Sequence, residues 1–224
     1  MNVTLIGSCR LSRVKNNNLN NRITYAHSTK EAIQFIKFLK NEITIPEPYN
    51  RICFRTGIVN RIDIEYSREY KELFDQTEVF IIEICSSKKY IHNEFYLHHL
   101  SVDERFEYTD YTPKDIRDSF KLEKQSDEEI ESDILELKKI LIDKKFIIVS
   151  HYNSKINGNL IPSRNHLINL LENICKKHKI HFINPTKILA AYGQEEIMGS
   201  DFGHYTETGL REIGKYVSDY IKIL

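Results

Sequence analysis

The fold follows from eight residues near the start of the chain, Val3-Thr4-Leu5-Ile6-Gly7-Ser8-Cys9-Arg10. Four apolar or β-branched residues ended by glycine are typical of a central strand in a parallel sheet, where both faces are covered. Gly7 permits a tight turn into a helix, so Ser8 and Cys9 emerge at the carboxyl edge of the sheet, where open α/β folds place their chemistry. Two interpretations stay open here: one residue is a nucleophile, or Ser8 only caps a short helix over 9–15 and Cys9 is a small core residue.

Composition narrows the possible functions. Lysine plus arginine and aspartate plus glutamate each total 32 among 224 residues, so no net charge attracts nucleic acid or an anionic membrane. The longest apolar runs, 79–82 and 146–149, are far shorter than the roughly 20 residues of a spanning helix, and the N-terminus lacks a signal-like segment. We therefore expect one cytoplasmic domain over 1–224, with neither nucleic acid nor membrane as partner.

Cysteines and histidines give no clear metal motif. Cys9, Cys53, Cys85 and Cys175 are widely spaced and form no CxxC pair, which argues against a zinc site and a disulfide framework. The pair His98-His99 has no carboxylate or cysteine at ligand spacing, and sequence neighbours point apart on a helix or strand. No metal is expected.

Helices are predicted from capping boxes and apolar periodicity. Ser28 to Glu31 and Ser126 to Glu129 are capping boxes that precede apolar residues at helical spacing. Further helices are expected over 68–74, from Ser163 onward and over 207–224.

Short apolar runs between these helices predict strands at 23–25, 51–54, 78–85, 146–150 and 180–183, whereas 62–66 is an edge strand or an extended loop. The polar run 16–21 is predicted as a surface loop. Alternation of strands and helices predicts an α/β fold with a central parallel sheet of about five strands. No element is clear over about 86–125, which we interpret as an irregular insertion or lid.

Glu83 is unusual because it is a carboxylate inside the most apolar strand. Burying it unpaired is prohibitive. It is either a supporting group beside a site or one half of a salt bridge to an arginine.

The strongest chemical motif lies just before the last helix, in Asp201-Phe202-Gly203-His204. An aspartate three residues before a histidine can hold the Nδ1 hydrogen and leave Nε2 as a general base. The turn after the first strand is the obvious source of the nucleophile. His27, at another strand-to-helix junction, either faces the same site or is an ordinary solvated residue.

These two motifs resemble the SGNH/GDSL hydrolase superfamily, which opens with a strand and Gly-Asp-Ser and closes with Asp-x-x-His. The Gly7-Ser8-Cys9 start looks still more like the GSCFA-type and capsular-polysaccharide acetyltransferase-like branch, in which cysteine stands in place of serine. The resemblance implies a flavodoxin-like three-layer α/β/α fold, with Cys9 at the nucleophile position and Ser8 in place of the family's aspartate. A shift of the turn by one residue would make Ser8 the attacking group instead.

The expected chemistry of this turn can be stated further. The ordinary pKa of a thiol is about 8.5, and this pKa is lowered at a helix N-terminus and beside an imidazolium. We therefore expect an activated Cys9. Arg10 either binds a carboxylate or phosphate or extends to solvent.

The family's other blocks supply oxyanion donors. Gly57 matches the glycine after the second strand, but the Gly-x-Asn-Asp block is absent, and Ser86 follows the third strand instead. Backbone N–H groups of Cys9 and Gly57 are candidate donors, as are His151 and Asn153; Asn153 is equally well explained as a turn residue.

Together these features predict an acyl-transferring enzyme, an esterase, deacetylase or acetyltransferase, that acts on an O-acyl group through a covalent acyl-enzyme. The resemblance implies a glycan or small-molecule substrate, no required cofactor, and acetyl-coenzyme A as a possible donor. The alternative is a carbohydrate- or small-molecule-binding protein on the same fold with little or no turnover.

Overall fold

A five-stranded sheet forms the centre of the computed structural model, which describes residues 1–15, 19–21 and 25–224. All of its strands are parallel, in the order β10-β7-β3-β1-β2. This is the flavodoxin-like strand order, and it confirms the predicted fold class. The strands are β1 (Val3–Ile6), β2 (Leu19–Asn21), β3 (Val79–Ile84), β7 (Lys145–Ser150) and β10 (His181–Ile183).

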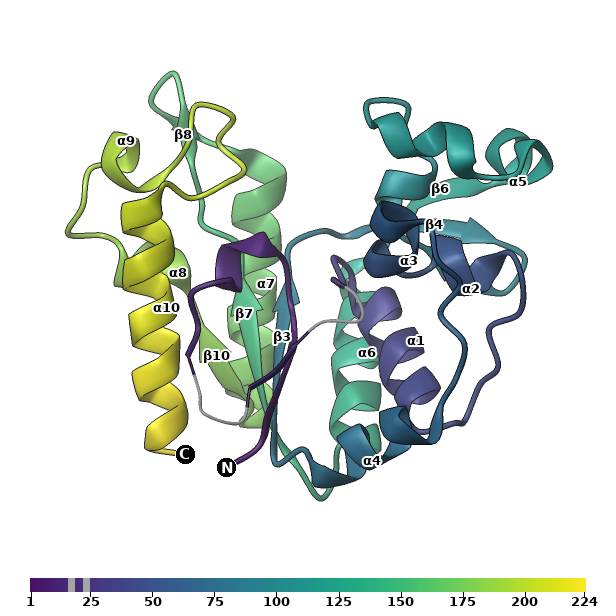
Figure 1. The fold of residues 1–224 in the computed structure, drawn as a ribbon. Coiled ribbons are helices and arrows are strands. Elements are labelled where there is room, and N and C mark those ends of the chain that lie inside the picture. Colours follow the sequence, from purple (N-terminus) through teal and green to yellow (C-terminus); the bar gives the residue numbers. More distant parts are fainter. Residues whose placement is uncertain (16–18, 22–24) are drawn as a thin grey trace.

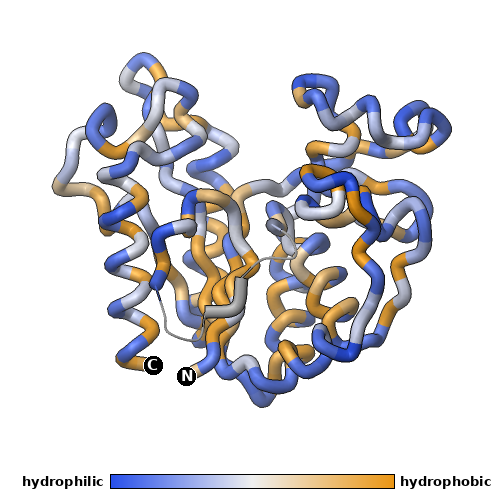
Figure 2. The backbone as a smooth tube through the Cα atoms, in the orientation of Figure 1, coloured by the Kyte–Doolittle hydropathy of each residue, from blue (hydrophilic) through white to orange (hydrophobic). Residues whose placement is uncertain are grey.

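Helices cover both faces of this sheet and give three layers (Figure 1). Alternate residues of β3 point to opposite faces. Phe80 and Ile82 pack with α1, α6 and α7, whereas Val79 and Ile81 pack with α10. Figure 2 shows the resulting apolar centre of the molecule. The helices are α1 (Thr29–Leu39), α2 (Tyr49–Ile52), α3 (Arg55–Asn60), α4 (Arg68–Gln76), α5 (Lys114–Ser119), α6 (Asp127–Ile140), α7 (Pro162–His178), α8 (Pro185–Ile188), α9 (Gln194–Ile197) and α10 (Glu207–Lys222).

The predicted helix starts are confirmed. The Ser28 hydroxyl accepts from the Glu31 N–H at the start of α1, and Ser126 accepts from Glu129 at the start of α6. Thr206 caps α10 by accepting from the Gly209 N–H. These hydroxyls satisfy N–H groups that a helix start leaves without partners.

Other local predictions were wrong. The strand expected at 51–54 is instead the end of α2 and the turn into α3, and Pro48 stands just before α2, where a missing N–H costs nothing. The 62–66 segment is an extended loop. Leu19–Asn21, expected to be loop, pairs with β1 as β2. Most of the strand predicted at 23–25 lies outside the described residues, and Tyr25 is not in a strand.

The segment expected to be irregular over 86–125 is instead largely folded. β4 (Lys88–His92) pairs antiparallel with both β5 (Phe95–Leu97) and β6 (Lys121–Lys124). Two 3-10 helices, η2 (His99–Ser101) and η3 (Glu107–Tyr111), and α5 connect β5 to β6. A small hairpin, β8 (Lys155–Ile156) with β9 (Asn159–Leu160), follows β7. Within the described parts of the chain, we find no helix with the length and hydrophobicity that a membrane crossing requires.

Candidate active site

A cavity of about 590 Å³ lies among the loops that follow β1, β3 and β7 and the loop before α10. Parallel strands bring these loops together at one edge of the sheet. Several predicted site residues line this cavity: Ser8, Cys9, Arg10, Ser86, His151 and His204.

The turn after β1 is held by Glu83 of β3. The Glu83 carboxylate is 1% exposed and accepts hydrogen bonds of 2.6 Å from the Ser8 N–H and from Arg10 Nε. Gly7 makes room for this arrangement, because a Cβ there would lie 3.3 Å from the Glu83 Cβ. Glu83 therefore has both predicted roles, as a salt-bridge partner and as the support of the turn that carries Ser8 and Cys9.

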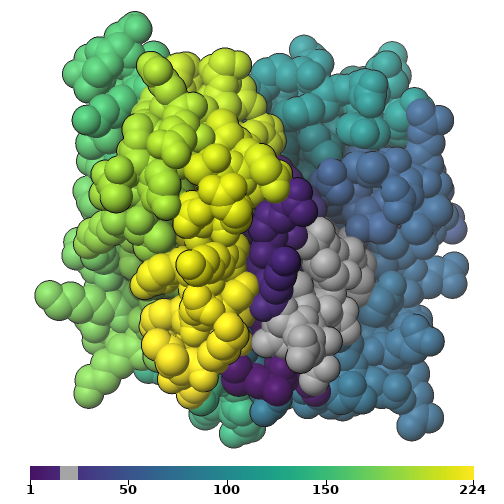
Figure 3. Space-filling view, turned by 60° about the vertical axis from the view of Figure 1, so that its left-hand side comes forward, coloured from purple at the N-terminus to yellow at the C-terminus, as the bar shows by residue number. Residues whose placement is uncertain are grey.

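Arg10 links the two ends of the chain. Its side chain is buried and binds the Glu83 carboxylate, which fits the expected binding of a carboxylate and excludes the expected extension to solvent. Nη1 donates to the Gly203 carbonyl at 3.2 Å, while Nη2 has no hydrogen-bond partner in the described parts of the structure. Figure 3 shows the first residues beside the last helix on one face of the molecule. The turn that carries Ser8 and Cys9 and the Asp201–His204 turn are thus joined directly.

Asp201 and His204 adopt the predicted arrangement. Asp201 Oδ2 lies 2.5 Å from His204 Nδ1, and Oδ1 accepts from the Gly203 and His204 N–H groups. These hydrogen bonds, led by that of His204, hold the pKa of Asp201 well below its ordinary value. Because a carboxylate can only accept, Nδ1 carries the hydrogen and Nε2 is left as the base.

Ser8 and Cys9 differ in access. Ser8 is 4% exposed, and its hydroxyl accepts from the Arg10 N–H as the cap of η1 (Cys9–Leu11). Cys9 is only partly buried. Burial is the main cause that raises the pKa of the Cys9 thiol above its ordinary value; Arg10 opposes this rise, and Glu83 adds to it. The expected lowering of this pKa was wrong, because a single 3-10 turn gives little helix dipole and the thiol loses water.

His151 lines the cavity but is arranged as an acceptor. Its Nδ1 lies 2.7 Å from the Tyr152 carbonyl, so Nδ1 must donate. Burial, together with Arg10 and Arg164, holds the pKa of His151 well below its usual range, so Nε2 carries no proton. In this state His151 cannot donate to an oxyanion.

Gly57 and Asn153 lie elsewhere. Gly57 is buried inside α3, where a Cβ would come within 2.5 Å of the Arg51 carbonyl oxygen, and it does not line the cavity. The Asn153 side chain donates to Asn165 Oδ1, which fits the alternative of a structural turn residue. Neither position lines the cavity.

Arg164 was missed by sequence reasoning. Its Nη1 contacts three acceptors, the Phe202 carbonyl at 2.8 Å and the Tyr152 carbonyl and Ser154 hydroxyl at 3.2 Å. Arg164 therefore holds the turn before His204 from the α7 side. Nothing in the local sequence marks it, because its partners are mostly backbone carbonyls.

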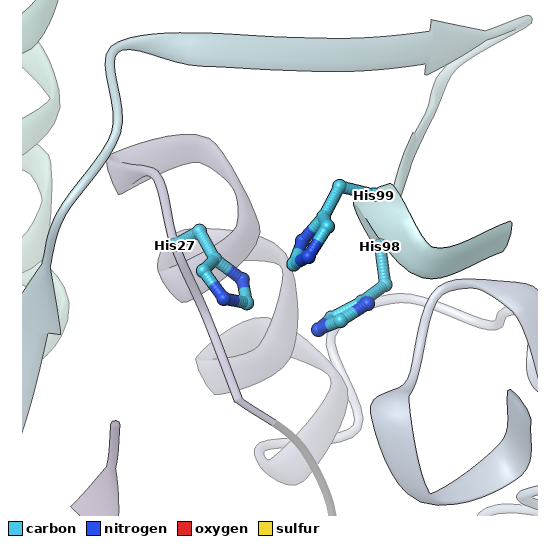
Figure 4. Close-up of side chains that lie close together, drawn as sticks. All are labelled: His27, His98 and His99. Atoms are coloured by element: carbon cyan, nitrogen blue, oxygen red, sulfur yellow. The ribbon is translucent and has the colours of Figure 1, made fainter. Parts of the chain in front are cut away.

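Three histidines gather on another part of the cavity wall. His27, His98 and His99 all line it, and their rings converge (Figure 4). The His98 and His99 rings stack with centroids 4.6 Å apart, so the expectation that these neighbours point apart was wrong. His98 caps η2, and this turn, unlike a regular helix or strand, places both rings on one side.

Comparison with known proteins agrees with the predicted polysaccharide-linked branch. The chain is 25% identical over 253 aligned residues to the Vi polysaccharide biosynthesis protein TviD of Salmonella typhi, covering 92% of this chain and 30% of that protein. Its fold is similar to a lipase/acylhydrolase from Enterococcus faecalis (TM-score 0.48, 10% identity, 99% and 96% of the two chains). It is also similar to Est24, a carbohydrate acetylesterase from Sinorhizobium meliloti (TM-score 0.43, 9% identity, 100% and 99%).

A family model gives the assignment. The model of the TviD N-terminal domain matches residues 1–117 and 103–219, which together span nearly the whole chain. The chain belongs to the TviD N-terminal domain family.

Proposed function

We propose that this protein transfers an acyl group to or from an oxygen of a glycan through a covalent intermediate on Cys9. The observation that carries this proposal is the bond from Arg10 to the Gly203 carbonyl, because it joins the turn of Cys9 to the turn of His204. Both side chains line the same cavity. The polysaccharide-biosynthesis relative supports a glycan as the substrate class.

Cys9 is the better candidate for the attacking group. The Ser8 hydroxyl is buried and occupied as a helix cap, whereas Cys9 is partly exposed to the cavity. Ser8 then has a supporting role, since its N–H fixes Glu83 beneath the turn.

The raised pKa of Cys9 determines how the first step must proceed. The thiol is protonated at neutral pH, so His204 Nε2 takes its proton as Sγ attacks the acyl carbon. The Sγ–C bond forms, the bond to the leaving oxygen or sulfur breaks, and His204 returns the proton to that atom. In the second step, water or a sugar hydroxyl attacks the thioester, loses its proton to His204 and releases Cys9.

Asp201 and the arginines support this cycle without reacting. Asp201 stays ionised and stabilises the imidazolium that forms when His204 takes a proton. Arg10 places a positive charge beside Cys9, which favours the thiolate and the oxyanion. The Cys9 N–H is the candidate oxyanion donor that remains once Gly57 is removed from consideration.

The acyl donor is also part of this proposal. Acetyl-coenzyme A supplies a thioester, which a cysteine nucleophile exchanges without a large change in bond energy. Hydrolysis and transfer share the acyl-enzyme, so the experiment tests that intermediate.

The test is to expose the protein to p-nitrophenyl acetate or acetyl-coenzyme A and locate the acetyl group by mass spectrometry. We expect one acetyl group on Cys9, none in Cys9→Ala, and acylation slowed by about 10²–10⁴-fold in His204→Ala. Ser8→Ala should keep the adduct on Cys9. An acetyl group on Ser8 would make Ser8 the nucleophile instead.

The alternative, a binding protein with little turnover, has one observation in its favour: the Cys9 thiol is not activated at rest. The acetyl adduct, compared with iodoacetamide labelling, distinguishes the two proposals. Formation of the Cys9 acetyl adduct that depends on His204 supports the enzyme. Labelling no faster than that of the buried Cys175, with no acetyl adduct, supports the binder.

A further inference from the structure

The three histidines of the cavity wall form a compact group from two distant segments. His27 precedes α1, and His98 and His99 stand at the start of η2. The His27 ring centroid lies 4.9 Å from that of His98 and 4.3 Å from that of His99. One ring nitrogen from each residue lies within 4.8 Å of the other two.

One ring nitrogen of this group, His98 Nε2, is buried and has no hydrogen-bond partner among the residues that the structure describes. His98 is fully buried, and its Nδ1 accepts from the Leu100 N–H at 3.3 Å, so Nε2 must carry the hydrogen of the neutral ring. A buried donor without an acceptor is rare in native proteins, and a bound ion or water is a common explanation.

We propose that His27, His98 and His99 bind one divalent transition-metal ion, with zinc as the first candidate. Imidazole nitrogens suit zinc, copper, iron and nickel, whereas magnesium and calcium prefer oxygen ligands. Three protein ligands and one open position are the arrangement of catalytic rather than structural zinc sites.

The distances are close to those that a metal needs. Nitrogens about 2.0–2.1 Å from a shared zinc ion lie about 3.4 Å apart, so each ring nitrogen has to move inward by less than about 1 Å. Side-chain rotation of the partly exposed His27 and His99 supplies most of this movement.

The groups that contact His27 and His98 fit this assignment. The Glu31 carboxylate lies 3.7 Å from His27 Nδ1, on the ring atom that is not needed for the metal when Nε2 is the ligand. Metal-bound histidines commonly donate their second N–H to such a carboxylate. If His98 binds the metal through Nε2, its hydrogen moves to Nδ1, which can then no longer accept from the Leu100 N–H. The lost hydrogen bond is long, at 3.3 Å, and therefore weak compared with a metal–imidazole bond.

The open position faces the cavity, since all three residues line it. The fourth ligand is then water or an oxygen of the molecule that occupies the cavity. This proposal is independent of acyl transfer by Cys9, and each is measured by its own experiment.

The test uses full-length protein purified without a metal-affinity tag, stripped with EDTA and titrated with Co²⁺ and Zn²⁺. We expect one Co²⁺ per chain, with visible d–d bands of a four- or five-coordinate ion, and displacement by one Zn²⁺. His27→Ala and His99→Ala should each weaken binding by at least about 100-fold, more than the 10–100-fold typical of replacing a residue that only hydrogen-bonds to a ligand. Glu31→Gln, which keeps a side chain able to cap α1, should weaken it by about 10–100-fold.

Two control variants make the result specific. His166 is exposed and pairs with Asp127, so His166→Ala should bind Co²⁺ as the wild type does. Cys9→Ala should also bind Co²⁺. Its absorption spectrum should match that of the wild type, because no cysteine sulfur is a ligand in this proposal. His98 is buried and its replacement risks misfolding, so only variants with a wild-type circular dichroism spectrum are compared. Absence of stoichiometric binding, binding that survives both histidine replacements, or binding lost in Cys9→Ala overturns the proposal.

Discussion

Replacing Glu83 with glutamine should destabilise the protein far more than its small size change suggests. Glu83 accepts 2.6 Å hydrogen bonds from the Ser8 N–H and Arg10 Nε, and both side chains of the ion pair are under 10% exposed. Glutamine keeps one acceptor oxygen but leaves the Arg10 charge buried and unpaired. Breaking a buried pair in this way costs about 3–5 kcal/mol. For a chain of this length that is a loss of roughly 6–20 °C in Tm.

The assay is urea unfolding followed by far-UV circular dichroism, with Glu136→Gln as the matched control. Glu136 forms a 2.5 Å ion pair with Lys37, but both side chains are a third or more exposed. Surface pairs of this kind contribute about 0–1 kcal/mol. The same substitution therefore compares a buried with an exposed carboxylate in one protein.

The pH dependence gives a second readout. Burial alone would raise the pKa of Glu83, but the Arg10 charge and the hydrogen bonds from Ser8 and Arg10 lower it below its ordinary 4.5. A lowered folded-state pKa gives stability that is present above about pH 4.5 and is lost as the pH falls through the folded value. The difference between wild type and Glu83→Gln should shrink in that direction. A difference at pH 7 no larger than that of Glu136→Gln would refute the reasoning.

Three further predictions address the site. Asp201→Asn should keep the turn, because Oδ1 can still accept from two N–H groups. It should lower kcat, measured by steady-state kinetics, by on the order of 10⁴, because it favours the wrong His204 tautomer. Alkylation of Cys9 by iodoacetamide should accelerate as the pH rises through 9.0 and above, and a plateau below pH 9 would contradict its raised pKa. Gly57→Ala should lower the free energy of unfolding in urea by about 1–3 kcal/mol, yet the folded protein should keep its activity. Gly193 has open space around it, so Gly193→Ala should change this free energy by less than about 1 kcal/mol.

The sequence was a good guide wherever a local pattern determines the structure. The runs that became β3 and β7 are apolar on both faces because helices cover both sides of the sheet. The capping boxes at Ser28 and Ser126 fix helix starts through bonds to residues only three positions away. Such signals need no tertiary information.

The failures occurred where partners are distant. Residues 51–54 form a short apolar run that fits a strand or a buried helix end equally well, and packing favours the helix. β6 is exposed along its whole length and carries three charged residues, so its pairing with β4 left little trace in the sequence. The register of an exposed strand such as β6 depends on contacts with distant residues, which the pattern of one sequence does not encode.

The candidate site divides in the same way. Asp201 and His204 are neighbours in sequence, so their pairing could be predicted from spacing alone. The bonds from Arg10 to Gly203 and from Arg164 to Phe202 go to backbone carbonyls, which every residue offers, so these two contacts could not be predicted from residue types. The histidine cluster was missed because η2 breaks the periodicity on which the prediction about His98 and His99 relied.

The register between β1 and β3 explains why the fold and the site depend on each other. Ile6 pairs with Ile82, so the same register places Gly7 beside Glu83. The absence of a side chain at Gly7 lets the Glu83 carboxylate reach the Ser8 N–H and Arg10. A slip of one residue would put an isoleucine there and turn the carboxylate to the opposite face. Arg10 would then lose its counter-ion and its hold on Gly203, and the turn of Cys9 would separate from the turn of His204.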